Sequence, residues 1–555
     1  MTRNYILIIY LLLFQLTNAQ SQQYLSKSID ALPTEKIFVH NSNDFLLTGE
    51  NLYYSIYCLD NLNQLSPYSK IAYIELINND NQSVLKQSIN LIDGSGYGDI
   101  FINTDIVTGT YKLAVYTQWM LNKGIVFSKN IFIVNPFSKK LKNSSVENQI
   151  TANSDTFVNG QNKKGKSFQN NQFIYSKREK VKLNLSEEFS LPDGLYSISV
   201  RKKNNFNIPK GNKSLSSVKK EANIYLPELR GSLIQGKVST NSSSLSVSDI
   251  KMSLSSKNLD LPVSAVTNEH GEFFFNIPNL DTKNVSIQIH DDHKDEFEII
   301  VHSKKSIDTN FSYFPQLYLN DSLTKTIKEK NLYSQIENAF FSVKRDSLLS
   351  QPDNNLLLDK ISKTYLLDDF KRFKTVKETF VEVISGAGFS KTKGKYKLSI
   401  TNPETYEILK FLSSLVIVDG YLLDNHEDLL NFDARKIKSV SIITDKYFYG
   451  NALYQGIAVV ETFKKDFSSS LTNRKNIKVT PVQPEKVYFF QDSESLKNQR
   501  IPDFRTQLYW DPNIDTSEKE ITFFTSDVNG EFEIDLVGYT EQGKFVSLKR
   551  TFLVH

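Results

Sequence analysis

The sequence has almost no cysteine: Cys58 is the single example in 555 residues. One thiol cannot close a disulfide within the chain, which excludes a small scaffold held together by cross-links. Cys58 ends a run of strand-forming residues, YYSIYC at 53–58, and has no histidine or other base close to it in the sequence. We therefore interpret it as a small buried apolar residue and not as a nucleophile.

An excess of charge of either sign is also missing. Lysine and arginine number 66 against 62 aspartates and glutamates, which leaves a net charge of +4. The basic runs at 163–166 and 201–203 are short and lack interleaved aromatic residues, so we interpret each as a solvated loop or a strand end. Nucleic-acid binding needs a basic stripe or patch, and the sequence predicts no nucleic-acid partner.

Long apolar runs are absent after the first 20 residues. Residues 5–16, YILIIYLLLFQL, follow Arg3 and precede small residues at Thr17 and Ala19, a pattern typical of a signal peptide over 1–19. The run is too short to span a bilayer comfortably. We expect cleavage after Ala19, no lipid anchor because no cysteine follows, and no transmembrane segment in the mature chain. The predicted location is outside the cytoplasm, in the periplasm or associated with the outer membrane.

Catalytic motifs are the last absence. The sequence contains no G-x-S-x-G, H-E-x-x-H or P-loop pattern. His290 and His293 form the densest set of possible metal ligands, but they follow a predicted strand at 285–289, and a solvated turn is the favoured interpretation over a metal site. The stretch 424–428, DNHED, is rich in oxygen ligands but lacks the spacing and glycine of a calcium loop, so its Asp and Asn residues are expected to cap a short helix.

Trp119 and Trp510 are interpreted as core or interdomain residues. No residue is therefore assigned as catalytic, cofactor-binding or metal-ligating, no cofactor is expected, and the chain is predicted not to be an enzyme.

What the sequence does contain is β-forming residues, with 37 phenylalanines and 27 tyrosines. Residues 34–136 alternate as half-buried strands do, with turn residues between them, which predicts a β-sandwich. The expected strands are 36–40, 51–59, 71–77, 83–91, 98–102, 109–116 and 131–134.

This region resembles the macroglobulin-type domains of α-2-macroglobulin-like proteins. The resemblance rests on the segments 35–60, 71–78 and 97–120, with Gly49, Gly98, Gly109 and 111–113 at the matching positions. It implies a sandwich fold and carries no activity. The thioester of the protease-trapping members needs a cysteine in a Cys-Gly-Glu-Gln context, which Cys58 does not have.

The next stretches read as a polar linker at 137–172, rich in Asn, Ser, Lys and Gly, and a partial β-sandwich with a polar loop at 173–228. Residues 229–303 resemble a carboxypeptidase regulatory-like domain through G-x-V at 236–238 and T-x-x-x-G-x-F-x-F at 267–275. The resemblance implies a transthyretin-like sandwich, in which Gly271 turns a hairpin and alternate phenylalanines face a core.

Residues 304–370 are predicted to be a helical connector, with helical periodicity at 321–343 and 354–366. A further helix at 375–384 is expected to begin at the N-cap Thr375, stop near Gly386, and bury one face. The residues assigned to that face are Val376, Phe380, Val381 and Ile384.

The stretch 371–467 resembles the plug domain of TonB-dependent outer-membrane receptors. The matching segments are LVIVDG at 415–420, the Leu-Leu pair at 429–430, IKSVSII at 437–443 and 447–462. A receptor barrel would need about two hundred further residues, so the resemblance implies a plug-like α/β domain without a barrel. Residues 481–555, with L-Y-W-x-P-N at 508–513, resemble another macroglobulin-type sandwich.

The sequence therefore predicts a mainly β, multi-domain chain of β-sandwiches plus one small α/β domain. The order of pieces resembles exported Bacteroidota proteins that combine macroglobulin-type, regulatory-like and plug-like domains. That resemblance implies a non-enzymatic scaffold or binding protein of the cell envelope, docking with outer-membrane or other envelope proteins. The alternative is an accessory ligand-binding component of TonB-linked uptake.

Overall fold

The structure is a computed structural model, and it describes the chain in separate ranges. The predicted signal peptide, 1–19, and nearly all of the predicted linker, including the basic run 163–166, lie outside the described residues. The described residues are 33–138, 173–185, 189, 191–204, 214–217, 225–256, 259, 261–278, 280–302, 307, 311–316, 321–349, 360–392, 394–402, 412–467, 474–489, 491, 501–515 and 520–555.

The chain is mainly β and multi-domain, and it divides into two compact units. Unit 1 consists of residues 1–229, 306–349 and 483–555, and unit 2 consists of 230–305 and 350–482. Both units are assembled from separated stretches, so the chain passes from one unit to the other at four points. Each unit is described by itself below.

The first sandwich of unit 1 has two antiparallel sheets around one core. One sheet has the order β1-β3-β6, and the other has the order β12-β8-β7-β4-β5, with β2 parallel to β8. These strands are β1 (Lys36–Asn41), β2 (Phe45–Leu47), β3 (Asn51–Leu59), β4 (Ile71–Ile77), β5 (Ser83–Asn90), β6 (Ser95–Phe101), β7 (Gly109–Tyr116), β8 (Ile125–Val134) and β12 (Ser214–Ser217).

Alternate side chains of β3 contribute to this core. Leu52, Tyr54, Ile56 and Cys58 point into it and are at most 1% exposed. The interpretation of Cys58 as a buried core residue is therefore confirmed. Three predicted strands, 51–59, 71–77 and 109–116, match in both position and extent, while 131–134 is only the last part of β8. The one-turn helix α2 (Gln118–Leu121), capped by the Thr117 side chain, was not predicted.

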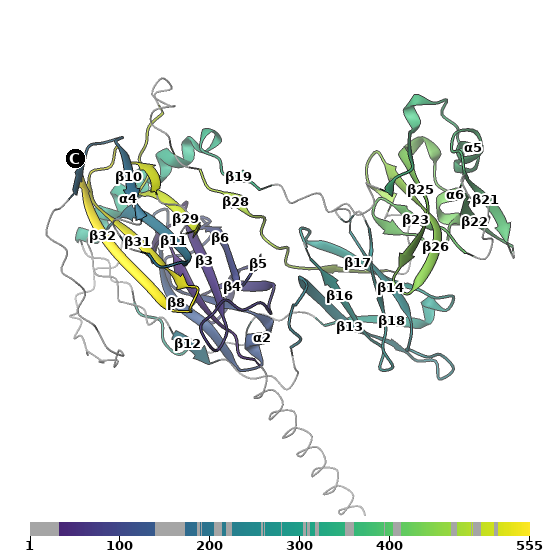
Figure 1. Cartoon of the computed structure of the whole chain (residues 1–555), viewed down its shortest axis with the longest axis horizontal. Coiled ribbons are helices and arrows are strands. Elements are labelled where there is room, and N and C mark those ends of the chain that lie inside the picture. The colour runs from purple at the N-terminus through teal and green to yellow at the C-terminus, as the bar shows by residue number, and fades with distance from the viewer. Residues whose placement is uncertain are drawn as a thin grey trace, which may run out of the picture. The chain divides into compact units, whose positions relative to one another are not determined.

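The second sandwich of unit 1 is built from the two halves of the chain. Its larger sheet has the order β29-β11-β31-β32-β9, and β10 pairs with β30. In Figure 1 the yellow C-terminal strands lie beside the blue strands β10 and β11. We call it the split sandwich. Its strands are β9 (Phe173–Tyr175), β10 (Lys180–Asn184), β11 (Gly194–Lys202), β29 (Gln507–Asp515), β30 (Glu520–Phe524), β31 (Gly530–Thr540) and β32 (Phe545–Val554).

The prediction of a partial sandwich at 173–228 and a separate one at 481–555 was therefore wrong. The strand β11 is hydrogen-bonded on one side to β29 and on the other to β31, so neither segment has a complete sheet alone. Tyr196, Ile198 and Val200 of β11 are fully buried against Phe532 and Leu536. Alternation along a strand shows which face is buried, but it does not show which strand lies alongside.

Helix α4 (Asp321–Ala339) belongs to unit 1 and covers β2 and β8. Leu323 and Ile327 pack with Phe45, Phe132 and Val134 in a small cluster. The predicted helix at 321–343 is confirmed as far as Ala339, after which a 3-10 turn, η3 (Phe341–Val343), follows. The short strands β19 (Ser347–Leu348) and β28 (Lys486–Val487) then pair with each other.

Unit 2 contains the third sandwich, which we call the inner sandwich. Its sheets have the orders β16-β13-β18 and β15-β14-β17-β27. The strand β27 comes from residues 474–478, far beyond the predicted end of this domain at 303. The strands are β13 (Ser232–Thr240), β14 (Lys251–Ser255), β15 (Val263–Val266), β16 (Glu272–Ile277), β17 (Asn284–His290), β18 (Phe297–Val301) and β27 (Arg474–Lys478).

The alternation predicted for β16 is confirmed: Phe273 and Phe275 are fully buried, and Phe274 faces outward. The hairpin predicted at Gly271 was wrong, because β15 pairs with β14 whereas β16 pairs with β13. The turn carries the chain from one sheet to the other. Gly271 has φ +77°, and a Cβ there would lie 2.5 Å from the Val238 carbonyl oxygen, so the position requires glycine.

The rest of unit 2 is an α/β body at 363–467. Its five-stranded sheet has the order β20-β25-β26-β23-β24, and a separate hairpin joins β21 and β22. Its elements are β20 (Lys363–Leu366), α5 (Val376–Glu382), β21 (Ala387–Thr392), β22 (Lys395–Ile400), β23 (Leu415–Val418), β24 (Tyr421–Leu422), α6 (Glu427–Leu430), β25 (Ile437–Tyr449) and β26 (Ala452–Thr462).

The predicted N-cap of the helix in this body is confirmed, because Thr375 forms a capping box with Glu378. Two details were wrong. Residues 363–366 form a strand, paired with 439–442, and not a helix. Val381 is 71% exposed, because it lies about 140° around the helix from Val376 and off the face that buries Phe380 and Ile384.

Asp419 and Gly420 form the turn that joins β23 to β24. Both residues have positive φ, +50° and +81°. The Asp419 carboxylate is 4% exposed and accepts hydrogen bonds from the Thr462 N–H (2.7 Å), the Thr462 hydroxyl (2.6 Å) and the Phe467 N–H (3.1 Å). This aspartate therefore ties the turn to the end of β26.

The split sandwich predicts how unit 1 responds to a core truncation. Ile198→Ala should lower the free energy of unfolding of unit 1 by about 2–5 kcal/mol, because it leaves a cavity in a packed core. Hydrogen exchange should then rise in β31 as well as in β11. Ile174, on β9 of the same sheet, is 61% exposed and provides the control: Ile174→Ala should change the unfolding free energy by less than about 0.5 kcal/mol. Normal protection of β31 in Ile198→Ala would contradict a shared sheet.

Candidate functional site

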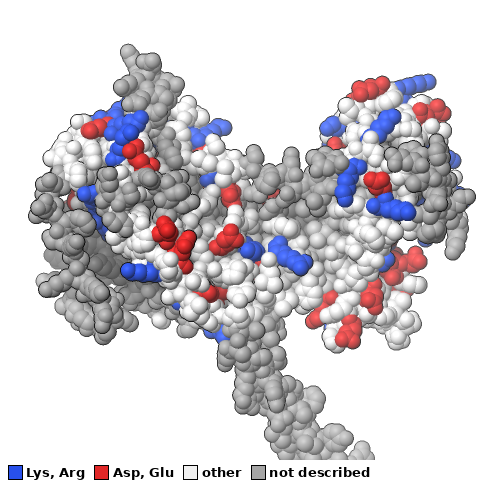
Figure 2. Space-filling model, in the orientation of Figure 1, with Lys and Arg blue, Asp and Glu red and all other residues white. Residues whose placement is uncertain are grey.

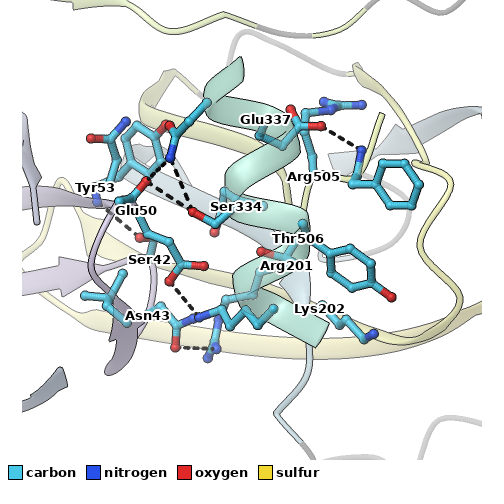
Figure 3. A pocket seen from close by; sticks show the side chains of 18 of the residues that line it. Ser42, Asn43, Glu50, Tyr53, Arg201, Lys202, Ser334, Glu337, Arg505 and Thr506 are labelled. Atoms are coloured by element: carbon cyan, nitrogen blue, oxygen red, sulfur yellow. Dashed lines mark hydrogen bonds and ion pairs between the residues drawn. The ribbon is translucent and has the colours of Figure 1, made fainter. Parts of the chain in front are cut away.

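A pocket of about 260 Å³ lies in unit 1, where α4 runs beside the ends of β11 and β29 and the turn after β2. Figure 3 shows this α4 pocket from close by. Side chains of both sandwiches and of the helix meet there. Among its lining residues are Ser42, Asn43, Glu50, Tyr53, Arg201, Lys202, Tyr333, Ser334, Glu337, Arg505 and Thr506.

Two charged residues of α4, Lys330 and Glu337, form ion pairs or hydrogen bonds with the two sandwiches. Lys330 is 8% exposed; its ammonium group lies 2.9 Å from Glu50 and donates to the Phe45 carbonyl oxygen at 3.0 Å. Glu337 accepts the Phe504 N–H at 2.7 Å and pairs with Lys344 at 2.6 Å. Ionised groups buried in this way need such partners, and here the pairs fix the helix in place.

The wall formed by β11 and the start of β29 is paired in the same manner. Arg201 contacts Glu533 at 3.1 Å and donates to Asn43 at 3.3 Å, and Arg505 contacts the fully buried Asp503 at 2.7 Å. The basic run 201–203 therefore ends a strand, as predicted, and Lys203 pairs with Glu531.

Lys202 is the lining lysine with the most distinct environment. Its ammonium group lies over the Tyr333 ring, 5.6 Å from the centroid, and Tyr333 stacks on Phe504 with centroids 5.4 Å apart. Burial lowers the pKa of Lys202, and the charge of Glu329 partly opposes that effect. An amine beside an aromatic wall can hold a ligand. Glu50 and Glu337 are paired with lysines, whereas Glu329, which also lines the pocket, acts on Lys202 through its charge.

The side chains weighed in the sequence as possible sites have structural partners. Burial raises the pKa of the Cys58 thiol, with Glu35 adding to the effect, so the thiol stays protonated and unreactive. Trp510 is buried between His40 and Tyr53, with ring centroids 5.2 and 6.1 Å away, which confirms it as an interdomain residue of unit 1. The Trp119 indole N–H donates to the Pro33 carbonyl oxygen at 2.8 Å.

His290 and His293 are directed to different partners. The His290 ring contacts the Ser253 hydroxyl at 2.7 Å and lies 3.9 Å from Asp424. His293 is exposed and lies 3.2 Å from Glu296. The solvated turn is thus right for His293, whereas His290 is partly buried. Within the described ranges, no three His, Cys, Asp or Glu side chains form a group suited to a metal ion.

The acidic stretch 424–428 also divides its side chains among separate partners. The N-cap of α6 is His426, whose side chain forms no capping hydrogen bond, so the expected cap by an Asp or Asn side chain was wrong. Asn425, just before it, accepts the Glu427 N–H at 3.2 Å, and Asp424 pairs with Lys294 at 3.4 Å. Glu427 accepts the Tyr396 N–H at 2.9 Å, and His426 accepts the Leu398 N–H at 2.9 Å. The stretch docks α6 on β22.

The polar junction between the two sandwiches of unit 1 was not predicted from the sequence. The Ser197 hydroxyl lies 2.7 Å from the His40 ring and accepts from the Tyr57 hydroxyl at 2.9 Å, and Tyr57 also contacts the Val537 carbonyl oxygen at 3.2 Å. These residues come from four strands, β1 and β3 of the first sandwich and β11 and β31 of the split sandwich, and more than a hundred positions separate β3 from β11. A pattern within one strand cannot reveal such a contact.

Comparisons with known proteins were made at three levels. No family model matches the sequence, and no curated protein matches it. Among solved structures, Salmonella α-2-macroglobulin reacted with methylamine aligns with 94% of this chain and 39% of its own, at 8% identity and a TM-score of 0.24. Trypsin-activated α-2-macroglobulin from Escherichia coli gives 94% and 41%, at 8% identity and a TM-score of 0.24.

Dimeric latent PorU from Porphyromonas gingivalis aligns with 94% of this chain and 34% of its own, at 9% identity and a TM-score of 0.15. The chain spans about two fifths of the length of the two macroglobulins. TM-scores this low carry no argument about family or activity, and the conclusions below rest on the described residues.

His426 predicts an acid-dependent loss of stability in unit 2. Burial, followed by the charge of Lys397, lowers the pKa of His426 from 6.5 to about 4. Between these values the unfolded chain binds a proton that the folded chain does not. Stability should therefore fall as the pH drops from 6.5 toward 4, by up to about 1.4 kcal/mol per pH unit.

The control is substitution by asparagine, whose side-chain oxygen can accept the Leu398 N–H. His426→Asn should flatten the stability–pH profile of unit 2 in that window, measured by urea unfolding at successive pH values. His293→Asn, at an exposed histidine, should leave the slope unchanged. An unaltered slope in His426→Asn would refute the assignment.

Proposed function

We propose that this protein is a non-enzymatic scaffold or binding protein of the bacterial cell envelope, which docks with outer-membrane or other envelope proteins. The observation that carries the proposal is the use of ionisable side chains in unit 1. Glu35, for example, is 1% exposed and accepts bonds from Ser66, Ser69 and Thr117. Glu50, Glu337 and Arg201 in the α4 pocket are likewise joined to Lys330, Lys344 and Glu533. This is the pattern of a braced framework.

The sequence pattern at 1–19 supports the envelope as the location. On the face drawn in Figure 2, basic and acidic side chains are interspersed over the described surface, so that face presents no large field of one sign. In the described part of the chain, no helix is both long and apolar enough to cross a bilayer.

An exposed apolar patch on the α/β body supports docking. Leu366, Phe370 and Phe463 are 48%, 43% and 52% exposed. Leu366 and Phe463 flank the start of β25: Leu366 pairs with Ser439, and the Phe463 N–H donates to the Lys436 carbonyl oxygen. The Phe370 ring lies 6.2 Å from that of Tyr365, the neighbour of Leu366 on β20. The guanidinium of Arg372 lies 5.4 Å from the Phe463 ring centroid. Aromatic residues combined with arginine are characteristic of the energetic centres of protein interfaces.

Docking predicts a cross-link that depends on this patch. In the native host, in-cell cross-linking should give a discrete adduct in the envelope fraction, and Phe370→Ser combined with Phe463→Ser should abolish it. Val381→Ser changes a more exposed apolar residue on α5, outside the patch, and should leave the adduct intact. An adduct that persists in the double variant, or a protein that remains monomeric throughout, would oppose the proposal.

Export is tested separately. The mature protein should begin at Gln20 in an intact-mass measurement. Ala19→Arg should prevent processing, because signal peptidase needs a small residue there. A full-length chain in the cytoplasmic fraction of the unmodified strain would exclude an envelope role.

The second candidate function is accessory ligand binding in TonB-linked uptake. A second pocket, of about 190 Å³ in unit 2, is the observation that favours it.

A further inference from the structure

The chain leaves unit 1 after Leu349 and returns to it at Gln483. The outgoing strand β19 and the returning strand β28 pair with each other, and they lie side by side in Figure 1. The Leu349 N–H also donates to the Glu485 carbonyl oxygen at 3.0 Å. We call residues 346–349 together with 483–489 the clasp, because this pairing holds the outgoing and the returning chain together within unit 1.

The returning half of the clasp is bound to the first sandwich. The Gln483 N–H donates to the carbonyl oxygen of Ser88 on β5 at 2.8 Å. The Gln483 side chain donates to the carbonyl oxygen of Asp99 on β6 at 3.0 Å and accepts the Tyr54 hydroxyl at 3.1 Å. Strands β5 and β6 are each the last strand of a sheet, so the clasp is attached to one edge of both sheets of this sandwich.

Apolar burial contributes little to this attachment. Tyr488 is 5% exposed, with its ring 5.0 Å from that of Tyr53, whereas Leu348 and Val487 are 63% and 50% exposed. A two-stranded ribbon is only marginally stable in water by itself. Segments with few buried apolar side chains open at a lower free energy than the core beside them. We therefore expect the clasp to open while the sandwich stays folded.

Two carboxylates lie near Lys486 of β28. Asp99 is 6% exposed and pairs with Lys486 at 2.8 Å. Asp346, at the start of the outgoing half, accepts the Phe489 N–H at 2.8 Å. Burial raises the pKa of the Asp346 carboxyl and the charge of Asp99 adds to the effect, against the bond from Phe489 and the charge of Lys486. The closed clasp therefore favours a neutral Asp346 carboxyl.

The other ionisable groups around Asp346 keep their charge state in mild acid. Burial raises the pKa of Tyr53 on β3 and of Tyr488 on β28, so both hydroxyls stay neutral. Two cationic residues that line the α4 pocket with Asp346 are held by carboxylates elsewhere: these are Lys344, paired with Glu337, and Arg505, paired with Asp503. The facing set is thus Asp99 from β6, Lys486 and Tyr488 from β28, Tyr53 from β3, and these two pairs.

We propose that the clasp is a proton-sensitive switch within unit 1. In mild acid the Asp346 carboxyl is neutral, Lys486 faces the single negative charge of Asp99, and the clasp closes. At neutral pH two carboxylates face one ammonium group, and the closed form is weakened. Because the clasp holds both ends of the stretch 350–482, its opening lengthens the tethers of that stretch. The switch is independent of the docking patch, so its failure leaves the docking proposal standing.

Hydrogen exchange of the mature protein at about pH 6 and about pH 4, corrected for the intrinsic effect of pH on amide exchange, tests the switch. Protection of residues 483–489 should be higher in acid, by up to about tenfold for each pH unit between the ordinary and the raised pKa of Asp346. Protection of β7, in the sandwich core, should not rise with it. Protection of the clasp that is equal at both pH values or lower in acid, or an equal rise in β7, would overturn the proposal.

Asp346→Asn removes the charge and keeps an oxygen that can accept the Phe489 N–H. Protection of residues 483–489 in this variant should already be high at about pH 6 and should not change at about pH 4. Asp105→Asn, at an exposed aspartate of the same sandwich, should keep the pH dependence of the unmodified protein. A pH dependence that persists in Asp346→Asn, or one that is lost in Asp105→Asn, would contradict the role of Asp346.

Gln483→Ala tests the attachment separately from the trigger. It removes the side-chain hydrogen bonds to Asp99 and Tyr54 and should lower the protection of residues 483–489 about tenfold at both pH values. The ratio between the two pH values should stay as in the unmodified protein, because Asp346 is intact. Unaltered protection in Gln483→Ala would show that these contacts do not hold the clasp closed, and the proposal would then be wrong.

Discussion

The placement of β11 between β29 and β31 is the constraint on which the rest of the structure depends. Each residue from Gly194 to Lys202 has a partner in β31, between Phe532 and Thr540. The strand β11 ends before residue 203, and its neighbours β29 and β31 begin after residue 506. The chain between them must therefore leave this sheet and return to it. Unit 2 is accordingly inserted into unit 1 as two segments, and α4 lies on the stretch of unit 1 between them.

Once that sheet is closed, α4 can join the two sandwiches of unit 1. Lys330 holds the helix to β2 and its turn, while Glu337 holds it to the backbone before β29. The junction of Ser197 with His40 and Tyr57 completes the contact between sheets. Polar groups that could serve catalysis elsewhere are here the means of joining domains. The ion pairs of Lys330 and Glu337 are accordingly part of the framework of unit 1.

The sequence predicted where most strands lie but not how they pair. Alternation identified β3, β4, β7 and the buried faces of β16 correctly, because burial on one face of a strand leaves a period of two. It could not show that β11 and β31 are neighbours, that β15 and β16 belong to different sheets, or that β27 completes the inner sandwich. The sites were hidden for the same reason: Lys330 and Phe45, for example, are 285 positions apart. The sequence predicted no role for Asp346, because whether its carboxyl faces a second carboxylate depends on residues that only the fold brings near.

A disulfide across the central register tests this account most directly. Arg201 and Glu533 are directly opposite in the β11–β31 ladder, and Cα atoms at such positions lie within disulfide reach. In a Cys58→Ser background, Arg201→Cys with Glu533→Cys should form an intramolecular disulfide under mild oxidation, detected by mass spectrometry of the digested protein. Arg201→Cys with Glu531→Cys, which is out of register on the same strand, should cross-link far less. Equal cross-linking of both pairs, or none in the first, would contradict a split sandwich closed by β11.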